Sequence, residues 1–309
     1  MKRKVSQIGP ATLMVSLPAK WAKKHNIKKG DELEVTEKGG SLLVGGEGAE
    51  ELAKTTINLN EIPDIENARD HFYWMLFSNA YKRGFDEVEV ILPNANVAPR
   101  VQKAVSNLLG FEIFDMTNKR CTIKSLANER EEEFNNMVRK SFLLMLQAAE
   151  MCYSDLKKGK LENMQNVSNI RDNVQKITDF CRRLINKKIY KNNEIAQYYY
   201  VILMRVILIT NRFPYIYNHL SKINKKVSNE VLEYFKKTNE LLKLLYETYY
   251  KKQVQNIGKI SVIDGIMAKK TDEFFWKKQS IADIGVIRHL SEVVKLNGGN
   301  SSLLMGIIL

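Results

Sequence analysis

The chain has 309 residues, of which 44% are hydrophobic and 27% charged, values typical of a globular protein with two or three domains. Its 48 Lys and Arg residues outnumber its 35 Asp and Glu residues, which gives a formal net charge of +13. Such a charge favours an anionic partner, namely nucleic acid, an anionic membrane surface or an acidic protein. Because AT-rich codon usage also enriches lysine and asparagine, only the local placement of charge argues for a function.

Cysteine spacing and the apolar runs argue against a disulfide-bonded secreted protein and against a membrane-spanning protein. Cys121, Cys152 and Cys181 stand about thirty residues apart without a CxxC pair, which favours free thiols in a reduced compartment over disulfides or a zinc site. The stretch MKRKVSQIG at the amino terminus lacks the apolar segment of a signal peptide. The most apolar run, residues 198–210, contains Arg205 and is shorter than the roughly 20 residues that a membrane span requires. We therefore expect a soluble, cytoplasmic protein.

Residues 1–48 alternate short strand patterns with one short helix pattern. The expected elements are strands at 5–9 and 12–17, a helix at 18–26 and a hairpin at 31–46 that turns at Gly39 and Gly40. Gly45, Gly46 and Gly48 predict a linker behind this module.

This module is too small to be stable alone, because domains below roughly 40 to 60 residues usually need disulfides, metal ions or oligomerisation. Disulfide and metal-ligand patterns are absent, so we expect a homodimer through the N-terminal domain. The apolar residues that a second copy would bury are Val5, Ile8, Leu13, Val15, Leu17, Trp21, Ile27, Leu33, Val35, Leu42 and Val44.

The succession VSxxG, VSLPxxW, NIKxGDxLEV and LLV resembles the swapped-hairpin DNA-binding domain of the SpoVT/AbrB type, over residues 1 to about 46. The resemblance implies a swapped-hairpin β-barrel in an interleaved dimer, with DNA as the partner. Matched by position, the DNA-binding residues would be Arg3 and Lys4 on the first strand and Lys20 and Lys23 on the helix. Helix geometry adds Lys24.

The helix pattern supports this interpretation independently. With Pro18 at the first helical position, Trp21 can turn inward while Lys20 and Lys24 lie one turn apart on the outside. These like charges repel, and an anion would relieve the repulsion. The alternative is a merely solvated helix face.

Pro10 stands where many family members have arginine, so we expect contacts mainly to phosphates and a modest sequence preference. A small-antitoxin role is also known for this fold, but the long C-terminal part argues against it.

Residues 54–127 predict a small α/β linking domain. The expected elements are a strand at 55–62, a helix at 65–84, a strand at 85–92, a helix at 97–110 and a hairpin at 111–126.

From residue 128 to 309 the sequence is almost entirely helical in its periodicity. The expected helices are 129–156, 162–186, 194–220, 230–254, 263–279 and 281–296. Their similar lengths favour two related three-helix bundles, at about 128–224 and 225–309. Aromatic residues and a methionine are expected to fill the cores, namely Phe142, Met145, Tyr198, Tyr199, Tyr200, Phe274, Phe275 and Trp276. The apolar tail at 301–309 could complete the last helix, pack at a dimer interface or dock on a partner.

This helical part resembles the PhoU family, specifically archaeal two-domain phosphate uptake regulators, through its architecture, its opening helix at 137–156 and its final helix at 286–297. Family members often bind metal clusters through carboxylate pairs one turn apart, because a hard cation needs several oxygens. Here asparagines occupy the expected positions, while Asp172 faces Lys176 and Asp264 faces Ala268. We therefore expect no metal cluster and no other cofactor. The asparagines concerned are Asn169, Asn173, Asn211 and Asn297.

Two acidic pairs remain, Glu129 with Glu133 and Glu66 with Asp70. Both are interpreted as acids that stabilise the first turn of a helix through its dipole.

No catalytic constellation appears. The four histidines lie on separate segments, and no glycine-rich phosphate-binding motif is present. We therefore expect that the protein is not an enzyme. The histidines are His25, His71, His219 and His289.

Together these patterns predict a dimeric DNA-binding transcriptional regulator of phosphate uptake or phosphate homeostasis genes. The alternative is a PhoU-type adaptor that controls a phosphate transporter or signalling protein by contact, its N-terminal module serving only dimerisation. A third interpretation is a metal-storing or metal-sensing helical bundle.

Overall fold

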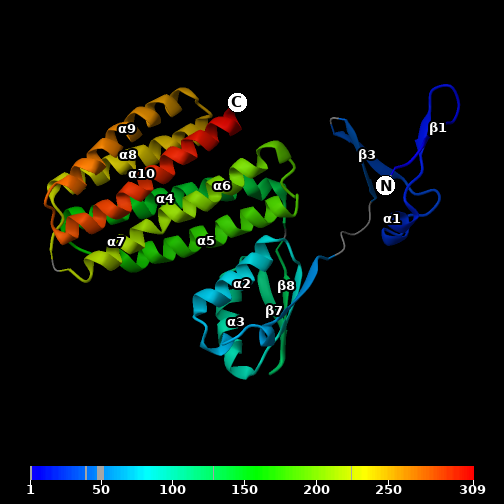
Figure 1. Cartoon of the computed structure of the whole chain (residues 1–309), viewed down its shortest axis with the longest axis horizontal. Coiled ribbons are helices and arrows are strands. Elements are labelled where there is room, and N and C mark those ends of the chain that lie inside the picture. Colours follow the sequence, from blue (N-terminus) through cyan, green and yellow to red (C-terminus); the bar gives the residue numbers. More distant parts are fainter. Residues whose placement is uncertain (1, 39, 47–51, 128, 224) are drawn as a thin grey trace. The chain divides into compact units, whose positions relative to one another are not determined.

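The computed structural model describes residues 2–38, 40–46, 52–127, 129–223 and 225–309 (Figure 1). The chain forms two compact units, Met1–Leu52 and Ala53–Leu309, and each is considered by itself. Among the described helices, none is both long enough and apolar enough to pass through a lipid bilayer. The limits of the three domains expected from the sequence stay predictions.

The described residues of the N-terminal unit form two small antiparallel sheets and one short helix. Its elements are β1 (Val5–Gln7), β2 (Leu13–Val15), α1 (Ala19–Lys24), β3 (Leu33–Lys38) and β4 (Ser41–Gly46). Strand β1 pairs only with β2, and β3 only with β4, so the described strands of one chain do not close into the expected barrel.

The predicted linker at Gly45 and Gly46 is wrong, because both residues lie in β4 opposite Glu34 and Leu33. Backbone pairing needs no side chain, so glycine can continue the ladder. Gly39 of the predicted turn and Gly48 of the predicted linker lie outside the described residues.

The second unit begins with the expected α/β segment, in which a four-stranded sheet has the order β5-β6-β8-β7. Strands β5 and β6 are parallel, and the other neighbours are antiparallel. Helices α2 and α3 pack on one another and cover one face of the sheet (Figure 1). The elements are β5 (Lys54–Asn58), η1 (Leu59–Glu61), η2 (Ile65–Asn67), α2 (Asp70–Lys82), β6 (Glu87–Ile91), η3 (Ala95–Val97), α3 (Ala98–Val105), β7 (Phe111–Met116) and β8 (Arg120–Ser125).

Alternation along β6 explains which face of this sheet is covered. Val88 and Val90 are fully buried, and Glu87 and Glu89 on the opposite face form ion pairs with neighbouring strands. Helix α2 begins at Asp70 rather than at residue 65, because Ala68 is extended, with ψ 142°, and separates η2 from the helix.

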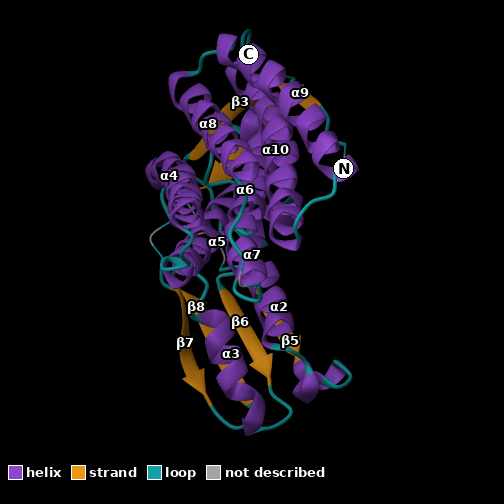
Figure 2. Cartoon of the chain, turned by 90° about the vertical axis from the view of Figure 1, so that its left-hand side faces the viewer, coloured by secondary structure: helices purple, strands orange, loops and turns teal. Residues whose placement is uncertain are grey.

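In the described residues, helices α4 to α10 follow the sheet segment and form the rest of the unit (Figure 2). They are α4 (Glu131–Lys158), α5 (Met164–Asn186), α6 (Asn193–Thr210), α7 (Arg212–Leu220), α8 (Asn229–Lys251), α9 (Gln255–Trp276) and α10 (Ile281–Ile308). The expected helix at 194–220 is divided into α6 and α7 at Asn211. Pro214 lies in the first turn of α7, where a helix tolerates a residue without a backbone N–H. Helix α10 packs against α6 and α7 as well as α8 and α9, so the two expected bundles share one core.

The carboxyl-terminal tail completes the last helix, since α10 extends to Ile308 rather than to residue 296. Three of the aromatic residues expected in the core are exposed instead: Tyr198 (38%), Phe275 (57%) and Trp276 (89%). Phe142, Met145, Tyr199 and Phe274 are buried as predicted.

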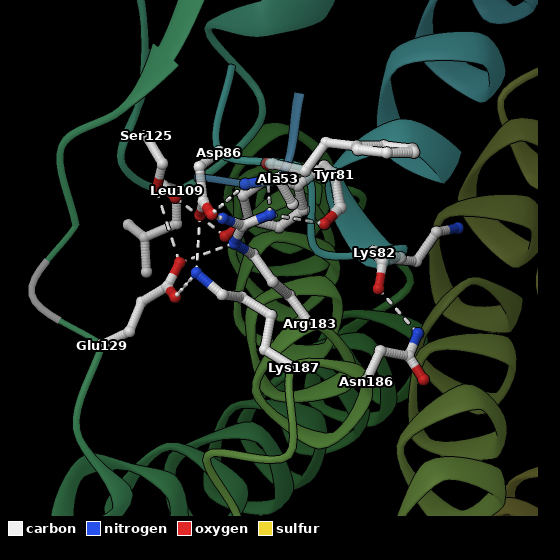
Figure 3. A network of polar contacts seen from close by, with 11 residues as sticks. Ala53, Tyr81, Lys82, Asp86, Leu109, Ser125, Glu129, Arg183, Asn186 and Lys187 are labelled. Carbon is white, nitrogen blue, oxygen red and sulfur yellow. Dashed lines mark hydrogen bonds and ion pairs between the residues drawn. The ribbon is translucent and has the colours of Figure 1, made fainter. Parts of the chain in front are cut away.

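A buried ion-pair network joins the α/β segment to helix α5 (Figure 3). Arg183 is fully buried and donates to Glu129 Oε1 at 2.6 Å and Asp86 Oδ1 at 2.7 Å. Lys187 contacts the same two carboxylates at 2.7 Å and 2.5 Å. The interpretation of Glu129 as a helix-dipole acid is therefore wrong, because it precedes α4 and pairs with cations of another helix. This network fixes how the sheet and the bundle meet.

Candidate nucleic-acid interface

Helix α1 carries three of the five predicted DNA-binding residues, and its neighbours determine how it begins and ends. Pro18 has φ −65° and ψ 124°, so it caps the helix rather than occupying its first turn, and its carbonyl accepts the amide of Ala22 at 2.9 Å. After His25, Asn26 takes a left-handed φ of 53°, which turns the chain toward β3. The last turn contains Lys23 and Lys24, where positive charge interacts favourably with the helix dipole.

The predicted residues lie in two places, and the expected position of Arg3 and Lys4 on the first strand is wrong, because β1 begins at Val5. Lys20, Lys23 and Lys24 project from one short stretch of α1, whereas Arg3 and Lys4 lie in the segment that leads into β1. All five are exposed. A single chain therefore presents two basic groups, and a dimer would present four.

The charge of this module is segregated over a longer segment than the five predicted residues. Residues 2–30 contain eight Lys and Arg residues and no acid, whereas all four acids of residues 1–46 fall within 31–37. Lys28 and Lys29 belong to this acid-free segment and stand at the turn after α1. The amide of Lys28 donates to Asp31 Oδ2 at 2.7 Å, which closes that turn. The basic charge is thus segregated along the first two strands, the helix and the turn.

The apolar side chains of this unit are not covered within one chain. No residue described within 2–46 is buried, and Trp21, expected to be buried, is only half-buried beside the ring of His25 at 5.1 Å between centroids. Leu13 is 71% exposed and Leu42 68%. Because burying a large aliphatic side chain stabilises by about 1.5–3 kcal/mol, this surface favours association with a second copy.

The positions at which a metal cluster of the PhoU type is expected do not bring several oxygen ligands together. Among the residues that the structure describes, no group of three His, Cys, Asp or Glu side chains could hold a metal ion. Asn169 accepts a hydrogen bond from Gln165 of its own helix. The amide atoms of Asn297 are buried and have no hydrogen-bond partner among the described residues.

The fold brings two of the four histidines together, which the sequence did not indicate. His219 and His289 border the same small cavity, where His219 Nε2 lies 2.9 Å from the carbonyl oxygen of Ile281. Burial, with the nearby Arg212 and Arg288, lowers the pKa of His289 to about 4. A neutral imidazole facing two guanidinium groups is a poor site for a cation.

The three cysteines are free and buried, and burial raises the pKa of Cys121 to about 11 and that of Cys152 and Cys181 as well. Thiols in this state are unsuited to nucleophilic attack at neutral pH. The expectation that the protein is not an enzyme stays a prediction.

Comparison with known proteins gives a match for the N-terminal module. Residues 7–45 match the family model described as antidote-toxin recognition MazE, bacterial antitoxin. This range holds α1 with its three lysines but not Arg3 and Lys4. No curated protein and no solved structure matches the chain. The match supports the AbrB-type interpretation of the N-terminal module and describes 39 of the 309 residues.

Proposed function

We propose that the protein is a dimeric regulator that binds DNA through its N-terminal unit. The observation that carries this proposal is the acid-free segment 2–30, which contains every predicted contact residue and overlaps the MazE-type match. Lysine is a compact cation suited to phosphate contacts, whereas the planar guanidinium of arginine is better suited to bidentate recognition of guanine. Binding should therefore depend steeply on salt and show moderate sequence preference.

Dimerisation supplies the geometry. Two copies of α1 and of the segment before β1 would present the basic groups twice, as a two-fold symmetric DNA site requires. The exposed apolar residues of β1, β2 and the β3–β4 hairpin would form the contact between copies.

The target genes are a finer proposal. The similarity of the helical part to PhoU proteins supports regulation of phosphate uptake or phosphate homeostasis genes. Mapping the genomic fragments bound by the full-length protein tests this assignment, since enrichment of promoters unrelated to phosphate transport would contradict it.

The decisive experiment measures binding of the full-length protein to its own promoter fragment and to an unrelated fragment over a range of salt. In the triple variant Lys20→Gln, Lys23→Gln, Lys24→Gln, a dimer loses six positive charges. The slope of log K against log [salt] should become less negative by about 0.9 for each phosphate that the variant no longer neutralises, or by about 5 if all six lysines bind phosphates.

A matched control removes three exposed lysines of α4, by Lys140→Gln, Lys157→Gln and Lys158→Gln. This variant has the same net charge as the first, so a general charge effect would weaken both equally. Unchanged DNA binding by the α1 variant would refute the proposed surface. Failure of the wild-type dimer to bind DNA at low salt would instead favour an adaptor that acts by protein contact.

A further inference from the structure

A large cleft lies within the second unit, between the α/β segment and the helical bundle. Its volume is about 730 Å³, and it is lined by residues of α2, α3, α5, α6 and α7. Sites for small organic ligands typically enclose about 300–1,000 Å³. The cleft is thus large enough for an organic ligand rather than a single inorganic ion.

The lining of this cleft is strongly basic. Two acids face it, and both are already paired: Asp70 with Lys103 at 2.7 Å and Asp172 with Arg171 at 2.9 Å. The six cations that line it are Lys82, Arg100, Lys103, Arg171, Lys176 and Arg182. Arg182 is paired with Asp179, a fully buried carboxylate.

Three of these cations have no carboxylate within ion-pair distance in the part of the chain that the structure describes. They are Lys82 of α2, Arg100 of α3 and Lys176 of α5, and each is half-buried. Arg100 donates to the backbone carbonyl of Ala68 at 3.0 Å, and Lys176 to that of Ser106 at 3.0 Å. Three cations from three helices therefore line one cavity without a carboxylate in ion-pair contact among the described residues.

Lys82 is the least satisfied of the three. Its ammonium group lies 5.9 Å from the ring centre of Trp74, and no hydrogen bond of this group exists among the described residues. Burial lowers the pKa of Lys82, although the charge of Asp179 acts in the opposite direction, so its charged form is incompletely solvated. A bound anion would supply the missing partner.

The remaining lining suits a planar, hydrogen-bonding group. The rings of His71 and Trp74 are stacked at 5.3 Å with an angle of 21°, and His71 is exposed, so an aromatic surface borders the cations. The side-chain amides of Asn211 and Asn218 have no hydrogen-bond partner within the described ranges. Aromatic faces bind nucleobases by stacking, and amides can bond to base edges and sugar hydroxyls.

We propose that this cleft binds a nucleoside phosphate, with the phosphates on Lys82, Arg100 and Lys176 and the base beside Trp74 and His71. This proposal is independent of DNA binding by the N-terminal unit. Because the cleft is bordered by both the sheet helices and the bundle, an occupant would contact both parts of the second unit at once.

Calorimetric titration of the full-length protein with ATP, GTP, CTP and UTP tests the proposal, with adenosine and inorganic phosphate as partial ligands. At least one nucleotide should bind more tightly than phosphate, and adenosine should bind weakly or not at all. Lys82→Gln should weaken nucleotide binding about ten- to a hundredfold, the factor that loss of a charged hydrogen bond gives. Lys140→Gln, an exposed lysine of α4, is the matched control and should bind as wild type.

The proposal is overturned if none of the nucleotides binds, or if inorganic phosphate binds as tightly as the best nucleotide. It is also overturned if the Lys82 variant, shown to be folded by its urea unfolding curve, binds nucleotide as wild type does. Competition with a DNA fragment separates this site from the N-terminal surface. If the triple α1 lysine variant loses nucleotide binding, or if Lys82→Gln weakens DNA binding equally, the cleft is not a separate nucleotide site.

Discussion

Replacing Arg183 by methionine should destabilise the second unit more than any exposed charge change. The Arg183 side chain is fully buried and donates four hydrogen bonds, two to carboxylates and two to the backbone carbonyls of Tyr81 and Phe85 at 2.9 Å and 2.7 Å. Methionine is of similar length and fills much of the same space, but it donates nothing. Asp86 and Glu129 would then share the single positive charge of Lys187 (Figure 3).

The expected loss in the free energy of unfolding follows from how far the two carboxylates that lose Arg183 are exposed to water. The side chains of Asp86 and Glu129 are 13% and 8% exposed, so water can recover little of their lost solvation. Removing one partner of a buried ion pair costs about 3–5 kcal/mol. We expect a loss of about 3 kcal/mol in the free energy of unfolding, since Lys187 remains. With a urea m-value of about 3 kcal/mol/M, the unfolding midpoint should fall by about 1 M.

Urea unfolding monitored by circular dichroism provides the measurement, with Arg139→Met as the matched control. Arg139 is exposed and donates to Tyr246 Oη at 3.2 Å, so its loss should cost less than about 1 kcal/mol. Adding Glu129→Gln to Arg183→Met restores charge balance around Lys187 and should recover part of the stability. A loss below about 1 kcal/mol for Arg183→Met, or further destabilisation by the second substitution, would refute the reasoning.

Two further predictions concern stability. Gly285→Ala should lower the urea midpoint, because the added methyl group would lie 1.9 Å from Nε2 of the His219 ring. In contrast, the methyl group of Gly265→Ala in α9 meets nothing within 4 Å and should stabilise the helix by about 0.5–1 kcal/mol. Equal effects of the two substitutions on the urea midpoint would contradict this prediction. Burial alone would raise the pKa of Asp86, but hydrogen bonds from Lys187 and the Ala53 amide hold it below its usual 3.8. The contribution of the Asp86 carboxylate to the free energy of unfolding is therefore present above pH 4 and lost as the pH falls further. Asp86→Asn should make the free energy of unfolding fall less steeply with acid. An unchanged dependence of stability on pH in this variant would count against this role.

Local sequence patterns predicted most elements of the protein. The alternating run of β6 and the apolar periodicity of α2, α4 and α5 encode their own structure, because side chains two or three to four residues apart face the same way. The same reasoning located α1 and its lysines, since proline marks the start of the helix and charge is visible in the sequence. The MazE-type match agrees with that interpretation.

The predictions are wrong where a residue's role depends on distant partners. The sequence predicts a helix-dipole role for Glu129, because it does not show that Arg183 and Lys187 lie beside this residue. Trp276 resembled a core residue by type, yet it ends α9 and is 89% exposed. Gly45 and Gly46 resembled a linker, although backbone pairing with β3 places them in a strand.

The sequence by itself determined the order of the elements and the segregation of basic charge in residues 2–30, because both depend on interactions between near neighbours in the chain. Only the tertiary structure decided which charges are compensated and where cavities form. Lys82, Arg100 and Lys176 are ordinary surface-type residues in the sequence. They become neighbours of one cleft because α2 packs against α5, next to the Arg183 network that joins the sheet segment to α5. Such convergence depends on long-range packing, which residue spacing alone does not encode.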